Sequence, residues 1–177
     1  VFMSYKKLRK KIDEKDVVVG VLGLGYVGLP LVYGFGIKKI KTIGFDVNRE
    51  KVKSLENGIS YVKDISDGQL KEIEDYFEVT NSIEDLERAD VILICVPTPL
   101  RKTKDPDISY ILSAIELIKR IDYRGKLIIL ESTTYPGTTE EILLPEFEND
   151  GKYEVGKDFF LAFSPERVDP GNEKYTI

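Results

Sequence analysis

The stretch that decides the fold runs from Val17 to Gly28 and reads VVVGVLGLGYVG. Its apolar part, Val17 to Leu22, lies between charged residues and glycines, which is the pattern of a parallel strand buried on both faces. Apolar residues then recur at helical spacing, at Val27, Leu31, Val32 and Phe35. The stretch therefore predicts a strand, a tight glycine turn and a helix in direct succession.

The glycines of this turn match the pattern G-x-G-x-x-G, and each has a physical task. Gly23 allows the tight turn, Gly25 lets backbone N–H groups approach a pyrophosphate, and Gly28 lets the helix pack closely on the strand. The N-terminus of the helix favours the bound anion. Asp46 ends a second predicted strand 18 residues beyond Gly28, where an acid meets the adenosine ribose of a dinucleotide. The glycine loop and Asp46 together predict that the protein binds a dinucleotide.

The charges around Asp46 predict which dinucleotide is bound. A carboxylate at this place repels the 2′-phosphate of NADP, so the expected cofactor is NAD. Arg49 and Lys51 follow closely and weaken that repulsion. We interpret Arg49 as an exposed charge on the next helix and Lys51 as a contact on the adenosine side of the cofactor.

The remainder of the chain alternates predicted helices and strands. Helices are expected at about 48–57 (capped by Asn48 and stopped by Gly58), 69–76, 108–118, after Asn81 or Ser82, and after Gly137; strands at 42–45, 77–80, 91–96, 127–130 and 159–163. This order predicts an α/β fold of the Rossmann type, doubly wound, with a mostly parallel sheet and helices on both faces. We expect one domain at 17–177, preceded by a solvated, charged leader at 1–16.

Composition excludes several classes of function. The chain has 177 residues, a net charge of −5 and a pI of about 5.0, which argues against a nucleic-acid binder. Its one cysteine, Cys95, lies in a predicted buried strand, which fits a core residue of a cytoplasmic protein. Apolar stretches are shorter than the roughly 18 residues that a membrane span needs. We expect no membrane contact and no metal site.

Three polar segments directly follow predicted strands, at the sheet edge where open α/β folds bind ligands. In the first, Pro97 and Pro99 hold Thr98 in one orientation. In the second, Ser132 to Thr134 either line the nicotinamide site or cap the next helix. The third contains Glu166 and Arg167, which form either a surface ion pair or an acid/base group with a neighbour that grips a substrate.

Four stretches, at 21–30, 95–100, 131–133 and 164–172, together resemble the UDP-glucose/GDP-mannose dehydrogenase family, in its branch that acts on UDP-N-acetylhexosamines. The resemblance implies that Tyr26 and Val27 lie against the NAD pyrophosphate, that Asp46 holds the ribose, and that Pro97, Thr98, Ser132 and Thr133 line the cofactor cleft. Glu166, Arg167 and Val168 would face the sugar nucleotide.

The resemblance also implies a reaction. Family members oxidise the sugar C6 hydroxyl to a carboxylate with two NAD, through intermediates on a cysteine, and contribute to polysaccharide biosynthesis. Thr133 and Glu166 match positions that assist through a bound water. The cysteine belongs to the family's central and C-terminal domains, which this sequence lacks. We therefore expect residues 1–177 alone to be inactive, and the intact enzyme to be a homodimer or larger.

The sequence fits more than one substrate and more than one class of function. UDP-N-acetylglucosamine is the expected substrate, because Arg167 and Val168 follow Pro-Glu where the glucose branch usually has an aromatic residue. UDP-N-acetylmannosamine, UDP-N-acetylgalactosamine and UDP-glucose are the alternatives. From another class, a non-catalytic NAD-sensing domain would share the glycine loop and Asp46, but it would not need Thr133 and Glu166.

Overall fold

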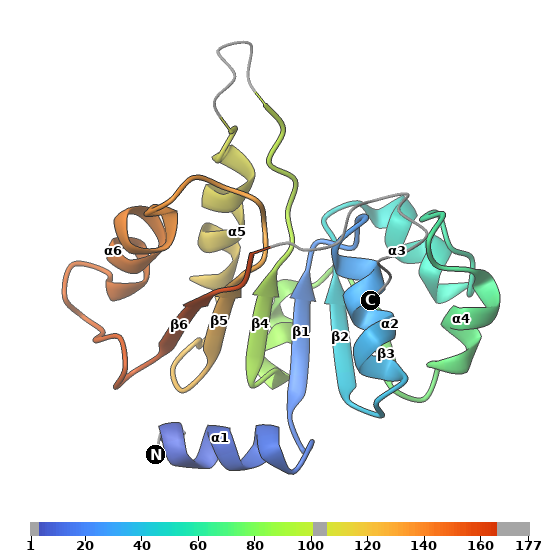
Figure 1. The fold of residues 1–177 in the computed structure, drawn as a ribbon, viewed down its shortest axis with the longest axis horizontal. Helices are drawn as coiled ribbons and strands as arrows, with labels where there is room; N and C mark the ends of the chain where they lie inside the picture. Colours follow the sequence, from blue (N-terminus) through green and yellow to red (C-terminus); the bar gives the residue numbers. More distant parts are fainter. Residues whose placement is uncertain (1–3, 101–105, 166–177) are drawn as a thin grey trace.

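A computed structural model describes residues 4–100 and 106–165. A six-stranded sheet forms its centre, with every neighbouring pair of strands parallel (Figure 1). Its strands, in spatial order, are β3 (Phe77–Thr80), β2 (Lys41–Phe45), β1 (Val18–Leu22), β4 (Val91–Ile94), β5 (Leu127–Leu130) and β6 (Phe160–Phe163). This is the strand order of the Rossmann fold, and it confirms the predicted fold class.

Helices cover both faces of the sheet, as expected for a doubly wound fold (Figure 1). They are α1 (Tyr5–Asp13), α2 (Gly28–Gly36), α3 (Arg49–Glu56), α4 (Asp67–Glu72), the 3₁₀ helix η1 (Ile83–Arg88), α5 (Ser109–Ile118), the π-helical η2 (Thr139–Leu143) and α6 (Leu144–Glu148). Two hydrophobic cores are packed against the sheet. In strand β4, Val91 and Leu93 belong to the first core, and Ile92 and Ile94 belong to the second core. None of the described helices is both long enough and apolar enough to cross a membrane.

Local sequence signals explain where the helices begin. The Asn48 side chain accepts hydrogen bonds from the Glu50 and Lys51 N–H groups, at 2.9 and 3.2 Å, which confirms the predicted cap of α3. Helix α4 begins earlier than predicted, because Ser66 and Gln69 form a capping box at its start. It ends at Glu72. The helix expected after Ser82 is a 3₁₀ helix.

The charged leader predicted before residue 17 contains a helix, α1, at residues 5–13, and most of its side chains are exposed (Figure 1). Leu8 is buried in one of the two cores. The Lys11 ammonium lies 2.6 Å from the Asp90 carboxylate, which also accepts a hydrogen bond from the Val18 N–H. The helix lies across the amino ends of the strands because these partners, far away in the sequence, are folded against it.

Tyr123 provides a test of the second core. Its ring is buried, and its hydroxyl donates a 2.7 Å hydrogen bond to the Phe147 carbonyl. Burial, followed by the nearby Tyr153, raises the pKa of Tyr123 to about 12. The unfolded value is about 10, so the folded protein keeps this proton longer, and the associated stability is lost as the pH rises from 10 toward 12.

We expect Tyr123→Phe to lower the free energy of unfolding by about 1–2 kcal/mol at pH 8, because a buried carbonyl loses its donor. The decline in stability between pH 10 and 12 should become shallower than in the unaltered chain. Urea unfolding at several pH values measures both effects. Tyr33→Phe is the control, since its hydroxyl contacts the Glu72 carboxylate in an exposed position. An unchanged alkaline slope in Tyr123→Phe would contradict this explanation.

Candidate cofactor-binding site

The loops that follow β1, β4 and β5 begin at the same level of the sheet. In the strand register, Leu22 lies beside Ile94, and Ile94 beside Leu130. Hydrogen bonds continue past the strand ends, from the Cys95 N–H to the Leu22 carbonyl at 2.8 Å and from the Glu131 N–H to the Ile94 carbonyl at 3.0 Å. The predicted site segments are therefore neighbours at the carboxyl edge.

The glycine loop has the geometry that its sequence predicted. Gly23 has a φ of +101°, which favours glycine, and a Cβ there would lie 2.6 Å from the Cys95 carbonyl oxygen. A Cβ on Gly28 would lie 1.8 Å from the Gly23 carbonyl oxygen. Around Gly25, in contrast, no atom lies within 4 Å of the Cβ position. The loop thus presents bare backbone to open space at the start of α2, which fits a pyrophosphate.

Asp46 lies directly beside this loop. Its carboxylate accepts hydrogen bonds from the Leu24 N–H at 3.0 Å and from the Asn48 N–H at 2.9 Å. The residue is buried, while Lys51 is half-exposed with its ammonium 3.6 Å from the carboxylate. Asp46 therefore joins the end of β2 to the glycine loop, and its contact with the ribose remains a prediction.

Tyr61 belongs to this cluster, although the sequence analysis missed it. It lies in the loop between α3 and α4, and its hydroxyl donates a 2.7 Å hydrogen bond to the Leu24 carbonyl. The Lys51 ammonium lies 5.5 Å from the centroid of its ring, within cation–π range. No local sequence pattern marks this contact, because it joins residues 37 positions apart.

Ser132 connects the loops after β4 and β5. Its buried hydroxyl donates to the Val96 carbonyl at 2.8 Å and, over a longer distance, to the Ile94 carbonyl. The next helix, η2, begins only at Thr139, so the alternative that Ser132 to Thr134 cap a helix is wrong. Thr98 is half-buried and Pro97 exposed on the neighbouring loop.

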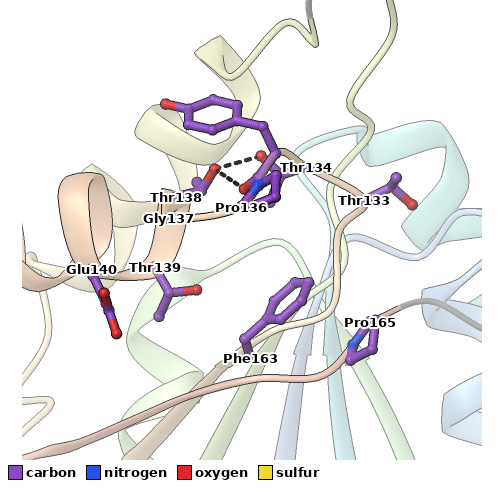
Figure 2. A pocket seen from close by; sticks show the side chains of 10 residues that line it. Thr133, Thr134, Pro136, Gly137, Thr138, Thr139, Glu140, Phe163 and Pro165 are labelled. Atoms are coloured by element: carbon purple, nitrogen blue, oxygen red, sulfur yellow. Dashed lines mark hydrogen bonds between the residues drawn. The ribbon is translucent and has the colours of Figure 1, made fainter.

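Thr133 is exposed at a cavity of about 570 Å³ between the loop after β5 and the end of β6 (Figure 2). Phe163 and Pro165 lie across this cavity from the loop that carries Thr133 and Thr134 (Figure 2). The Thr138 hydroxyl contacts the Thr134 hydroxyl at 2.8 Å and donates to the Tyr135 carbonyl at 2.9 Å, which fixes the cavity wall.

The predicted substrate-facing residues Glu166, Arg167 and Val168 lie outside the described residues. Pro165, directly before them, lines the cavity near Thr133. The predicted roles of these three residues in sugar binding and proton transfer therefore stay predictions.

Replacing Asp46 tests whether this cluster serves the cofactor. Asp46→Ala removes the acceptor for two backbone N–H groups, so we expect a loss of about 1–3 kcal/mol in the free energy of unfolding. NAD should bind at least about tenfold more weakly, because one hydrogen-bonded group is worth about that factor. The preference for NAD over NADP should shrink, since the carboxylate no longer repels a 2′-phosphate.

Calorimetric titration with NAD and with NADP measures these changes. Asp158→Ala is the matched control, because its carboxylate also accepts a backbone hydrogen bond, from the Glu154 N–H at 2.9 Å, in the segment before β6 and away from the glycine loop. Equal NAD affinity in Asp46→Ala and Asp158→Ala would refute a cofactor role for Asp46.

The parallel sheet in the order 3-2-1-4-5-6, the glycine loop and the buried acid after β2 define a dinucleotide-binding domain of the Rossmann type. Residues 17–176 match the family model of the UDP-glucose/GDP-mannose dehydrogenase family, NAD binding domain. The chain belongs to this family of oxidoreductases, and its cofactor is NAD.

Several similar proteins are nucleotide-sugar dehydrogenases. The chain is 39% identical to UDP-N-acetyl-D-glucosamine 6-dehydrogenase of Pseudomonas aeruginosa over 92% of its own length and 38% of that protein. It is 41% identical to Protein CapL of Staphylococcus aureus, over 90% of this chain and 37% of that one. The solved structure of the UDP-D-ManNAc dehydrogenase of Pyrococcus horikoshii matches with a TM-score of 0.79 at 40% identity, over 87% of this chain and 37% of that chain. The chain therefore spans less than two fifths of these relatives.

Proposed function

We propose that this chain is the NAD-binding part of a UDP-N-acetylhexosamine 6-dehydrogenase, with UDP-N-acetylglucosamine as the substrate. The observation that carries the UDP-N-acetylhexosamine part of the proposal is the 39% identity to the Pseudomonas aeruginosa UDP-N-acetyl-D-glucosamine enzyme over 92% of this chain. The choice of N-acetylglucosamine rests on Arg167 and Val168, which follow Pro-Glu in the sequence. UDP-N-acetylmannosamine is the second candidate, because the Pyrococcus horikoshii UDP-N-acetyl-D-mannosamine dehydrogenase is 40% identical.

The cofactor and the residues of this chain contribute different parts of the proposed oxidation. NAD, when bound, accepts hydride from the sugar carbon. The chain holds the pyrophosphate on the glycine loop and the adenosine ribose at Asp46. Thr133 is exposed at the mouth of the cavity, where its hydroxyl can hold a water beside the nicotinamide. Glu166 accepts or returns the proton in this proposal, while Arg167 and Val168 contact the sugar nucleotide.

We also propose that residues 1–177 alone do not oxidise the sugar. The family resemblance implies a nucleophilic cysteine, and Cys95 is the one cysteine of the sequence. It is buried at 5% exposure in the core beside β4, where a sugar carbon cannot reach its thiol. A cytoplasmic location is proposed because a single cysteine suits a reducing compartment, and the intact enzyme is proposed to be a homodimer or larger.

The experiment combines binding and turnover. The purified chain should bind NAD saturably in a calorimeter, yet form no NADH when UDP-N-acetylglucosamine is added. An intact dehydrogenase of the family serves as the positive control for turnover. UDP-sugar-dependent NADH formation by the 177-residue chain would contradict the proposed inactivity.

Titrations in the presence of NAD then compare UDP-N-acetylglucosamine, UDP-N-acetylmannosamine, UDP-N-acetylgalactosamine and UDP-glucose. Tightest binding of UDP-N-acetylglucosamine supports the proposed substrate, and tighter binding of another sugar replaces it. A chain that binds NAD or NADH but none of these sugars would favour the NAD-sensing alternative.

A further inference from the structure

Leu24, in the middle of the glycine loop, is fixed from three directions. Its side chain is fully buried. Its N–H donates to the Asp46 carboxylate at 3.0 Å, and its carbonyl accepts the 2.7 Å hydrogen bond from the Tyr61 hydroxyl. Two side chains from different parts of the sequence thus hold the two peptide groups on either side of one residue.

The contact with Tyr61 sets the direction of the next peptide group. A trans peptide is planar, and its C=O and N–H point in opposite directions. The described chain contains no cis peptide bond. With the Leu24 carbonyl directed at Tyr61, the Gly25 N–H of the same planar peptide group points away from Tyr61.

We propose that Tyr61 is a positioning residue for the cofactor, which holds the peptide between Leu24 and Gly25 so that the N–H groups from Gly25 onward face the NAD pyrophosphate. The inference deepens the NAD assignment and requires no UDP-sugar. Its failure is therefore distinguishable from a failure of the proposed dehydrogenase function.

The surroundings of Tyr61 support this role. Burial, followed by the Asp46 carboxylate, raises the pKa of Tyr61, so its hydroxyl remains a donor throughout the neutral range. The Lys51 ammonium contacts both holding groups, at 3.6 Å from the Asp46 carboxylate and 5.5 Å from the Tyr61 ring centroid. The glycine loop is therefore held by one cluster of three contacting side chains, those of Tyr61, Lys51 and Asp46.

Removal of the hydroxyl alone tests the proposal. In Tyr61→Phe we expect the Kd for NAD to rise about tenfold, the size of effect of one lost hydrogen bond to a buried group. The Kd for adenosine, which has no pyrophosphate, should stay unchanged. Tyr123→Phe is the matched control, because its hydroxyl also donates at 2.7 Å to a backbone carbonyl, far from the loop in the second core. It should lower stability and leave the NAD Kd unchanged.

Two results would overturn the proposal: an NAD affinity that Tyr61→Phe does not alter, or an equal weakening of NAD and adenosine. The second result would assign Tyr61 a general structural role. A measurement on the unaltered chain covers the case in which Tyr61→Phe does not fold. In an amide NMR titration with ADP-ribose, the Gly25 and Tyr26 signals should shift more than that of Gly68, and equal shifts would likewise refute the proposal.

Discussion

Gly28→Ala is expected to destabilise the domain by at least about 3 kcal/mol, the upper end of the range for overpacked interiors. The new Cβ would lie 1.8 Å from the Gly23 carbonyl oxygen and 3.2 Å from a Val21 methyl group. Neither the loop backbone nor the buried strand β1 can move away without breaking the turn. Since domains are stable by only about 5–15 kcal/mol, much of the chain should unfold at moderate urea concentrations.

The measurement is a urea unfolding curve followed by circular dichroism. Gly68→Ala is the matched control, because a Cβ at this position in α4 meets its nearest atom, the Ser66 hydroxyl, at 3.8 Å. Replacing glycine in a helix without a clash should stabilise the chain by about 0.4–1 kcal/mol. Similar unfolding midpoints for Gly28→Ala and Gly68→Ala would show that the close contact in the loop is not real.

Gly25→Val should have the opposite profile, with an intact fold and little NAD binding. No atom lies within 4 Å of the Cβ position, so the free energy of unfolding should change by less than about 0.5 kcal/mol. A bulky side chain there would occupy the space of the pyrophosphate. If that clash costs 1–3 kcal/mol, as in an overpacked interior, the Kd for NAD should rise roughly ten- to hundredfold.

Calorimetric titrations with NAD and with adenosine show whether the loss of binding depends on the pyrophosphate. NAD affinity should fall steeply in Gly25→Val, whereas adenosine affinity should change little. Gly58→Val is unsuitable as a control, because the φ of +70° at Gly58 would itself be strained. Gly25→Ala is the better comparison and should give an intermediate loss. Full NAD affinity in Gly25→Val would place the pyrophosphate elsewhere.

The sequence predicted the sheet well, because strands buried on both faces are continuous apolar runs. The bounds of β5 and β3 were predicted correctly, at Leu127–Leu130 and Phe77–Thr80. Strand β4 ends at Ile94, two residues before the end of its apolar run. The apolar pattern could not show this end, because Cys95 and Val96 remain buried or half-buried beyond the last residue of the strand.

Features that depend on distant partners could not be predicted. The pairing of Lys11 with Asp90 that holds α1 joins residues 79 positions apart. Lys126 is buried near the start of β5, where its ammonium donates to the Glu87 and Ala89 carbonyls and burial lowers its pKa. A sequence pattern assigns such a lysine to the surface, because only the fold brings the two carbonyls to it.

The candidate site was predicted to the extent that its residues follow strands. Gly23, Gly25, Gly28 and Asp46 have the expected arrangement, since strand ends in a parallel sheet are necessarily neighbours. The Ser132 hydroxyl donates to backbone carbonyls, and its predicted place in the cofactor cleft stays a prediction. Tyr61 follows no strand, so no rule of strand ends indicated it.

Helix α1 lies at the amino ends of the strands, whereas the glycine loop lies at their carboxyl ends (Figure 1). The first described residues therefore offer an attachment point that leaves the carboxyl edge accessible. A sensor surface or a fluorescent label coupled ahead of Ser4 would keep the mouth of the cofactor site directed toward the solution. The titrations with NAD and UDP-sugars can thus be repeated on immobilised protein without blocking ligand entry.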